Sequence, residues 1–237
     1  MVEYGSSQEI RVYDWRLLAV QQLDFSVLIE YLPAIMNGLF MTIKISIMSI
    51  ILGSIMGVGG ALCRTSKSLL LRSIGNIYVE WIRNTPLLIQ ILFIYFGLGV
   101  FLNLSPMVAS VLALSFFSGA YITEIIRAGI RSIHRGQREA ALSIGMTEWQ
   151  VMRLIILPQA IKRILPPLAG QFITLIKDSS LVSVIAVTDL TYVAKNIVTI
   201  TFRAFEVWFA IAAFYFILSF GLSLAVRKLE ERLAESD

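Results

Sequence analysis

The sequence has few of the residues that carry catalysis or bind metals. Its 237 residues include one cysteine, Cys63, and one histidine, His134. A single cysteine rules out a disulfide within the chain. Together the two residues supply neither a convincing nucleophile–base pair nor a set of metal ligands. An enzymatic function therefore ranks low, and no metal site is expected.

The sequence also lacks a phosphate-binding loop and carries little charge. It contains no Gly-Lys pair, which the G-x-x-x-x-G-K-[ST] motif requires. Only 15% of the residues are charged, whereas 57% are hydrophobic and the mean hydropathy is +0.77. A soluble domain of this length would not normally carry so much apolar surface. We expect an integral membrane protein that does not itself hydrolyse ATP.

Long uncharged runs define the expected spans. Runs of 19, 20 and 40 residues without charge are Ile45–Cys63, Val207–Val226 and Asn84–Thr123. About 20 apolar residues cross a bilayer as a helix, so the longest run can hold two spans around the turn "GLGVFLNLSP". A further apolar segment is interrupted only by Lys177 and Asp178. The predicted fold is all-α, with spans at roughly 31–63, 76–100, 106–130, 159–186 and 205–227.

Lysine and arginine gather on one side of this arrangement. The 63–75 loop, the segment after the third span and the C-terminal tail are basic, whereas the 101–106 turn has no basic residue. By the positive-inside rule, the N-terminus lies outside and the C-terminus inside. We expect an extracytoplasmic or interfacial segment over 1–30, one membrane domain over 31–232 and a cytoplasmic tail over 233–237. The pI of about 9.3 then indicates contact with membrane lipids rather than nucleic acid.

A charged stretch over 135–158 predicts a helical hairpin between the third and fourth spans. Gly136 is expected to end the third span, and "QREAALSI" favours a short helix. Gly145 suits a left-handed C-cap, and Thr147 with Gln150 suits a capping box. The second helix is expected to end at Pro158. A hairpin with a small-residue face at Ala140, Ala141 and Gly145 and an ordinary loop folded back on the bundle both fit this spacing.

The hairpin sequence resembles a known motif. The sequence has Glu139-Ala140-Ala141, then Gly145 after three intervening residues, then Ile155-Ile156-Leu157-Pro158 after nine more. This pattern is similar to the EAA motif of ATP-binding-cassette (ABC) importer permeases. Other segments resemble the polar amino-acid subfamily of these permeases, including "EWIRNTPLLIQ", "GAYITEIIRAGI" and "LIKDSSLVSVIAV". The resemblance runs from about residue 31 to 232.

The resemblance implies a type I ABC importer permease in the bacterial inner membrane. Such a subunit moves polar amino acids inward. It works with a pair of ATPase subunits that hold ATP and magnesium, a second permease subunit and an extracytoplasmic solute-binding protein. It implies that Glu139 helps to dock the loop on an ATPase, that Gly145 supplies the turn, and that Ala140 and Ala141 supply the close contact. No cofactor is implied for this chain.

A second class of function is an ion- or proton-coupled carrier or channel. Glu124, Lys177 and Asp178 would then act as relay groups, and no ATPase would be needed. This alternative leaves the hairpin over 135–158 unexplained.

Two groups of polar residues in the spans are candidates for the solute pathway. Arg83, Asn84 and Thr85 precede Pro86, which frees a backbone carbonyl group. Glu80 with Arg83, and Glu124 with Arg127, can instead be structural pairs at helical spacing. Lys177, Asp178, Ser179 and Ser180 interrupt the fourth span and predict either a broken helix that binds solute or a helix end near the outer interface.

Overall fold

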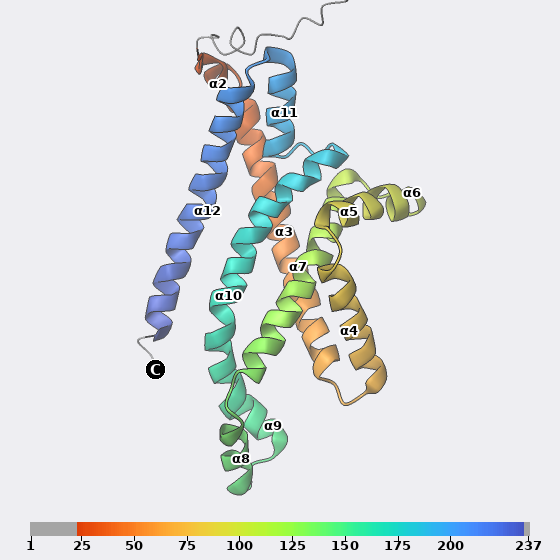
Figure 1. Cartoon of the computed structure of the whole chain (residues 1–237), viewed down its shortest axis with the longest axis vertical. Coiled ribbons are helices and arrows are strands. Elements are labelled where there is room, and N and C mark those ends of the chain that lie inside the picture. Colours follow the sequence, from red (N-terminus) through yellow and green to blue (C-terminus); the bar gives the residue numbers. More distant parts are fainter. Residues whose placement is uncertain (1–22, 235–237) are drawn as a thin grey trace, which may run out of the picture.

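In the computed structural model, which describes residues 23–234, the chain is a bundle of long helices (Figure 1). Four helical segments are long and apolar enough to cross a membrane. Two shorter helical segments, Leu69–Arg83 and Leu87–Leu102, are long and apolar enough when taken together and give a fifth candidate span. The described residues therefore have the all-α membrane fold that the sequence predicts. Most of the expected segment 1–30 and the end of the tail 233–237 lie outside the described residues.

The helices follow one another through short connections. In chain order they are α2 (Ser26–Glu30), α3 (Leu32–Thr65), α4 (Leu69–Arg83), α5 (Leu87–Leu92), the π-helical turn η1 (Phe93–Leu98), α6 (Gly99–Leu102), α7 (Pro106–Arg131), α8 (Arg135–Ser143), α9 (Glu148–Gln150), the π-helical turn η2 (Val151–Ile156), α10 (Leu157–Asp178), the 3-10 helix η3 (Ser179–Ile185), α11 (Leu190–Thr201) and α12 (Ala204–Ala234).

The helices α3 and α7 pack along each other at the centre of the bundle, and glycines on α3 allow them to approach closely. A Cβ atom added at Gly57 would lie 2.4 Å from the Cγ2 atom of Ile122, and one at Gly53 would lie 2.1 Å from the hydroxyl oxygen of Ser118. The Thr123 hydroxyl lies 3.1 Å from the carbonyl oxygen of Gly57, across the seam. Gly53 and Gly57, four residues apart on one face of α3, therefore serve packing within this chain.

The structure departs from the continuous helix expected over 76–100. The helix α4 ends at Arg83, and the chain bends by 109° into the α5–α6 segment. The bend follows from Pro86, which has no N–H group to continue the α4 ladder and which disfavours helical geometry in the residue before it. The segment ends at Asn103, whose φ of 50° is left-handed, as expected for the predicted turn.

The hairpin also departs from two expectations. The helix α7 ends at Arg131, and Gly136 lies in the first turn of α8. Pro158 does not end the second arm, because it follows η2 and occupies the first turn of α10, where a missing N–H group costs little. As a result, Glu148–Ile185 is one helical segment of 38 residues, longer than the span expected over 159–186.

The far end of this segment is tied to α3 through α11. The Asp189 carboxylate caps α11 by accepting from the backbone N–H groups of Thr191 (3.2 Å) and Tyr192 (3.0 Å). The N–H group of Leu190 donates to the Thr42 hydroxyl of α3 (3.0 Å). Asp189 is fully buried, and this burial raises its pKa to about 6 despite the two backbone donors.

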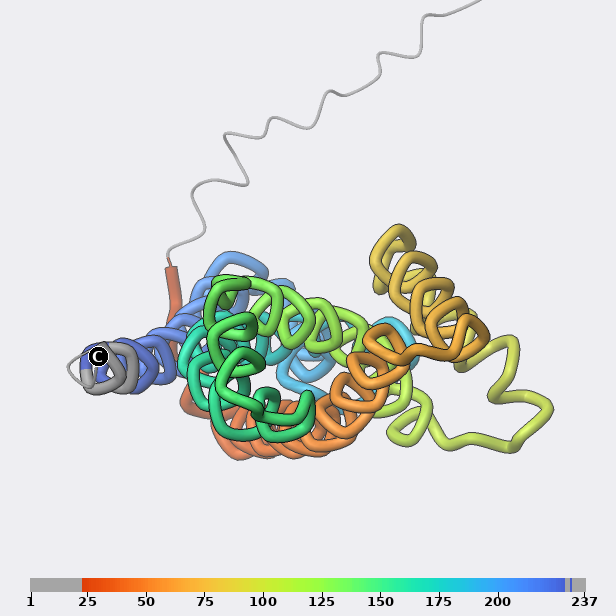
Figure 2. Tube along the Cα trace, turned by 90° about the horizontal axis from the view of Figure 1, so that it is seen from below, coloured from red at the N-terminus to blue at the C-terminus, as the bar shows by residue number. Residues whose placement is uncertain are grey.

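The helix α12 runs along one side of the bundle and faces mostly outward (Figures 1 and 2). Only 6% of its most apolar stretch of 18 residues is buried within the chain. Its first turn is fixed by Glu206, whose carboxylate accepts from the backbone N–H group of Asp24 (3.1 Å) and lies 3.5 Å from the Arg203 guanidinium. The remaining apolar surface must be covered by lipid or by another subunit.

The α3–α7 seam gives a direct test of this packing. Replacing Gly57 with alanine should lower the free energy of unfolding by about 1–3 kcal/mol, because the new Cβ overlaps Ile122 and must displace it. Gly59→Ala is the matched control, since a Cβ atom there meets nothing within 4 Å. Thermal unfolding of the two purified proteins in detergent measures the difference. Equal melting temperatures for Gly57→Ala and the wild type would contradict the close approach.

Candidate coupling loop and transport pathway

The hairpin formed by α8, α9 and η2 projects beyond the ends of α7 and α10 (Figure 1). Gly145 has a φ of 84°, so the left-handed C-cap that the sequence predicts is confirmed. The capping box is confirmed as well: the Thr147 N–H group donates to the Gln150 side chain (2.8 Å), and the Gln150 N–H group donates to the Thr147 hydroxyl (3.4 Å). An ion pair between Arg138 and Glu148 joins the two arms.

The exposed face of the hairpin is smaller than the motif suggests. Glu139, Ala140 and Gly145 are exposed, whereas Ala141 is only 5% exposed. Ala141 belongs to a buried cluster with Val151 and other apolar residues of the two arms. One turn of α8 places neighbouring residues on different faces, so Ala141 points toward η2 while Ala140 points outward. Glu139, Ala140 and Gly145 are therefore accessible from outside the hairpin, and Ala141 is not.

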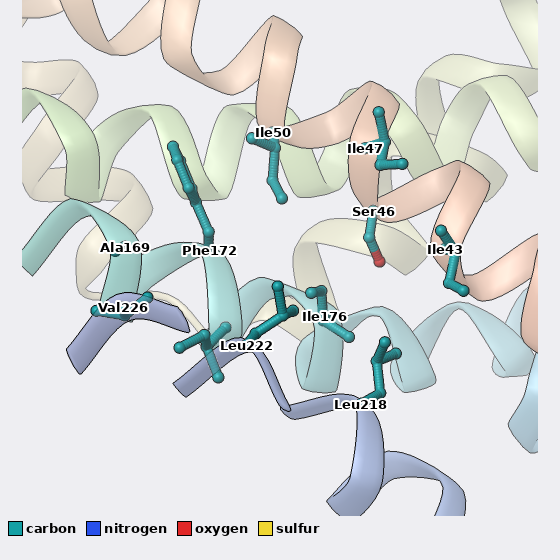
Figure 3. Close-up of a pocket in the computed structure, with 11 residues that line it drawn as sticks. Ile43, Ser46, Ile47, Ile50, Ala169, Phe172, Ile176, Leu218, Leu222 and Val226 are labelled. Atoms are coloured by element: carbon teal, nitrogen blue, oxygen red, sulfur yellow. The ribbon is translucent and has the colours of Figure 1, made fainter. Parts of the chain in front are cut away.

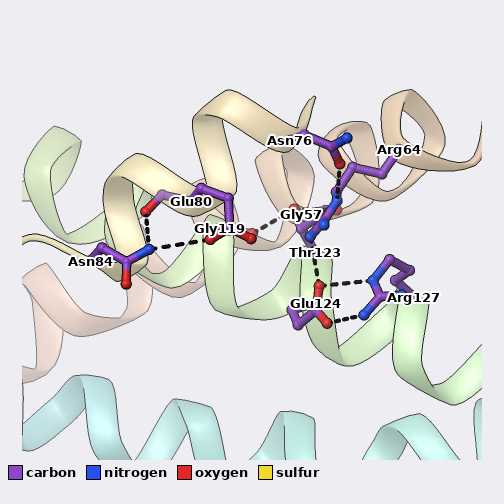
Figure 4. Close-up of polar contacts among 9 residues, drawn as sticks. All are labelled: Gly57, Arg64, Asn76, Glu80, Asn84, Gly119, Thr123, Glu124 and Arg127. Atoms are coloured by element: carbon purple, nitrogen blue, oxygen red, sulfur yellow. Dashed lines mark hydrogen bonds and ion pairs between the residues drawn. The ribbon is translucent and has the colours of Figure 1, made fainter. Parts of the chain in front are cut away.

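Glu124 links α7 to α3 and, through Arg64, to α4 (Figure 4). Its carboxylate forms ion pairs with Arg127, one turn along α7, and with Arg64 of α3 at 2.6 Å. The Arg64 Nε–H group also donates to the Asn76 side chain of α4 (2.8 Å). The predicted pairing of Glu124 with Arg127 is confirmed. Arg64 is a second cation on the same carboxylate, a contact that spacing along one helix could not reveal.

Arg83, Asn84 and Thr85 form the corner of the broken span. The Asn84 amide donates back to the Glu80 carbonyl oxygen (2.7 Å) and carboxylate (3.2 Å), and the Thr85 hydroxyl donates to a carbonyl of α4. The Arg83 guanidinium lies 5.2 Å from the ring centroid of Tyr121 on α7. Arg83 thus faces an aromatic ring and does not pair with Glu80, so the predicted pairing of these two residues is wrong.

Gln90 holds this corner together, and sequence reasoning did not identify it. It is 8% exposed. Its amide N–H₂ group donates from α5 back to the carbonyl oxygens of Ile82 (2.8 Å), in the last turn of α4, and of Thr85 (3.1 Å), within the break. These acceptors fix the orientation of the amide. The available signal was a lone amide residue four positions after Pro86 in an apolar run, since a proline break leaves carbonyl groups to be satisfied.

Lys177, Asp178, Ser179 and Ser180 lie where α10 tightens into η3. Lys177 is exposed and lines a groove between α10 and α12 with Tyr215 and Ser219. Asp178 is half-buried, and the buried Ser179 hydroxyl donates to the Ile176 carbonyl (2.7 Å). The α-helix therefore ends at this sequence, as either of the two predicted interpretations requires.

The structure places the corner at Arg83–Thr85 near both of the other predicted groups. The helix α5, which follows the corner at Arg83–Thr85, packs against η3, which follows Asp178. Leu87 and Val182 share one buried cluster there. On the other side of the corner, Glu124 pairs with Arg64, which also contacts Asn76 in the middle of α4, and Arg83 lies close enough to interact with the Glu124 charge.

A separate cavity of about 310 Å³ lies between α3, α10 and α12 and is almost entirely apolar (Figure 3). Its only polar side chain is Ser46, whose hydroxyl already donates to the Thr42 carbonyl (2.7 Å). This cavity does not suit a polar solute. Among residues 23–234, no group of three or more His, Cys, Asp or Glu side chains is placed to hold a metal ion.

Similarity to known proteins covers most of the chain. Residues 49–235 match the family described as "Binding-protein-dependent transport system inner membrane component". The chain belongs to this family. The glutamine transport system permease protein GlnP of Escherichia coli (strain K12) is 40% identical over 90% of the chain and 98% of its own length. The arginine transport system permease protein ArtQ of Bacillus subtilis (strain 168) is 37% identical over 91% of the chain and 99% of its own length.

A solved structure of the same kind agrees with the observed fold. One chain in a crystal structure of an amino acid ABC transporter with histidines is 43% identical and superposes with a TM-score of 0.86, covering 89% of the permease and 99% of that chain. The resemblance to ABC importer permeases is therefore confirmed, and the ion-coupled carrier is not favoured. The permease is a multi-pass inner-membrane component, and ATP hydrolysis belongs to separate subunits. The family implies ATPase, binding-protein and second-permease partners.

Replacing Gln90 tests how the broken span is held. Gln90→Leu should lower the free energy of unfolding by about 1–3 kcal/mol, because two half-buried carbonyl groups lose a donor that is itself buried. Gln159→Leu is the control, since the half-buried Gln159 amide reaches one carbonyl, that of Ile155, at 2.8 Å. Thermal unfolding in detergent should show the larger decrease for Gln90→Leu. A smaller decrease than at Gln159 would mean that the corner does not depend on this amide.

Proposed function

We propose that the permease carries polar amino acids into the cytoplasm, driven by a pair of ATPase subunits that dock on the hairpin. The observation that carries this proposal is the projecting hairpin, with its left-handed Gly145 and exposed Glu139, in a chain 40% identical to a glutamine permease. A compact, internally hydrogen-bonded device at the end of two spans is suited to transmit force from a partner. An unstructured loop would absorb that force.

Each residue of the hairpin has a separate role in this proposal. Glu139 and Ala140 form the docking surface, and Gly145 allows the turn. Ala141 acts through packing, because its small side chain lets α8 approach η2. ATP and magnesium bind to the ATPase subunits, and this chain needs no cofactor of its own. The hairpin and the C-terminus are cytoplasmic, and the N-terminus is extracytoplasmic.

The solute pathway is proposed to run past the two irregular segments of the spans. Arg83, Asn84 and Thr85 lie at the bend of the broken span, and Lys177, Asp178, Ser179 and Ser180 lie at the end of α10. Both segments carry charge and backbone groups suited to the amino and carboxylate groups of a zwitterion. Glu124 contributes to the pathway by holding α3, α4 and α7 in register, because Arg64 and Arg127 already occupy its carboxylate. The pathway is completed by a second permease subunit.

Reversing the charge at Glu139 should abolish docking of the ATPase. The amount of ATPase that co-purifies with the Glu139→Lys permease is expected to be at least ten-fold lower than with the wild type. The melting temperature should stay unchanged, because the side chain is exposed. Glu30→Lys is the control, since Glu30 is also exposed but is the last residue of α2, near the other end of the bundle. Normal recovery of the ATPase with Glu139→Lys would exclude this docking surface.

The transport function is tested by ATP hydrolysis in lipid discs that contain the permease and its co-expressed ATPase. Hydrolysis should rise several-fold only when a solute-binding protein and one class of amino acid are both present. Glutamine, arginine, histidine and glutamate form a suitable panel, because they differ in charge and size. Uptake that follows an ion gradient without any associated ATPase would instead support the carrier.

A further inference from the structure

A basic cavity of about 480 Å³ lies where α7 meets the hairpin, apart from the residues assigned to docking and to the pathway. Four basic side chains and four apolar ones line it. The basic residues are Arg131, His134, Arg135 and Arg138, and the apolar residues are Ile130, Ile133, Met152 and Ile156. Ile133 and Ile156 are buried and belong to the hairpin's own core, so the floor of the cavity is fixed.

The charges around this cavity are only partly neutralised. Arg138 pairs with Glu148, but among the described residues no carboxylate lies within ion-pair distance of Arg131 or Arg135. The Nδ1 atom of His134 accepts from the Gly136 N–H group (3.1 Å), so in the neutral ring the proton is on Nε2. The cavity therefore presents two arginines and a ring N–H donor with a net positive charge.

The depth of the cavity decides which anion it can meet. The 26 residues of α7 extend about 39 Å at 1.5 Å per residue, which exceeds the roughly 30 Å of hydrocarbon in a bilayer. The last turn of α7, with Arg131 at its end, therefore reaches the level of the lipid headgroups. An anion at this level is most often a phosphodiester, and apolar walls beside it suit the first carbons of acyl chains.

We propose that this cavity binds the phosphate group of an anionic phospholipid, with Arg131 and Arg135 as its main ligands. Guanidinium groups match phosphate oxygens in a two-pronged geometry, and the Ile130 and Met152 side chains contact the glycerol and acyl region. The bound lipid would bridge the end of α7 and the start of α8, and would so fix the base of the hairpin relative to the membrane.

Two other occupants fit the charge but not the surroundings. A free phosphate ion would make no favourable contact with the four apolar side chains that line the cavity. An acidic surface of the ATPase would meet the exposed residues Glu139 and Ala140, whereas Arg131 lies at the membrane end of the hairpin. A lipid titration distinguishes both of these occupants from a phospholipid.

The test is a lipid titration of the purified full-length permease in a neutral detergent. Dioctanoyl phosphatidylglycerol, dioctanoyl phosphatidylcholine and inorganic phosphate are each added at equal concentration and ionic strength, and the melting temperature is measured. Phosphatidylglycerol should raise it by about 5 °C at saturation, and the other two should change it by less than 1 °C. In Arg131→Gln/Arg135→Gln the shift should be lost. The control Arg72→Gln, which removes another exposed arginine, should keep it.

The outcomes separate the sources of the anion. An equal shift with inorganic phosphate would overturn the lipid assignment, and so would a phosphatidylglycerol shift that survives the double substitution. Absence of the shift in the wild type, with loss of ATPase co-purification from the double variant, would assign the cavity to the ATPase instead. The melting temperatures of the variants without added lipid show whether they fold. None of these results depends on which solute the permease carries.

Discussion

Backbone polar groups in a membrane must find their partners within the protein, and this constraint determines where the chain can be irregular. At the bend after Arg83, the Gln90 amide of α5 satisfies one carbonyl group in the last turn of α4 and another within the break. At the end of α10, the chain tightens into a 3-10 helix and the Ser179 hydroxyl satisfies another carbonyl. A polar solute can meet backbone groups only at such places, so the same constraint that limits the fold also limits the pathway.

The regular part of the bundle depends on the contact between α3 and α7. Glycines remove the side chains that would separate the two helices, and Thr123 then reaches a carbonyl group of the opposite helix. Near the end of the same seam, Arg64 and Arg127 share the Glu124 carboxylate, and Arg64 extends the contact to Asn76 on α4. Tight packing at one level and a charge cluster at the other hold three helices in a fixed relation.

Local signals in the sequence were sufficient for the class of fold and for the hairpin. Uncharged runs predicted the spans, and the Gly145 turn and the Thr147 capping box were correct because each depends on a few neighbouring residues. Errors arose where distant contacts or helix geometry decide the outcome. The effect of Pro158 was misjudged, because a π-helical turn places it in the first turn of α10.

The contacts of the candidate site were harder to predict than its position. The motif drew attention to Ala140 and Ala141 together, but only the folded hairpin shows that Ala141 is buried. Arg64 and Gln90 could not be assigned from the sequence, because their partners lie 60 residues away in one case and across a bend in the other. Spacing along a helix predicts the face on which a side chain lies. It does not predict which side chains of a second helix pack against that face.

The continuity of the segment from Glu148 to Ile185 has a mechanical consequence. At 1.5 Å per residue, the 22 residues of α10 extend about 33 Å, from the base of the hairpin to the 3-10 helix that begins at Ser179. Pro158 lies in the first turn of α10 and forms no hinge there, whereas Pro166 and Pro167 interrupt the hydrogen-bond ladder farther along the helix. A displacement of the hairpin therefore passes directly into α10, which packs against α7, and the two interior prolines mark the place where this helix can bend.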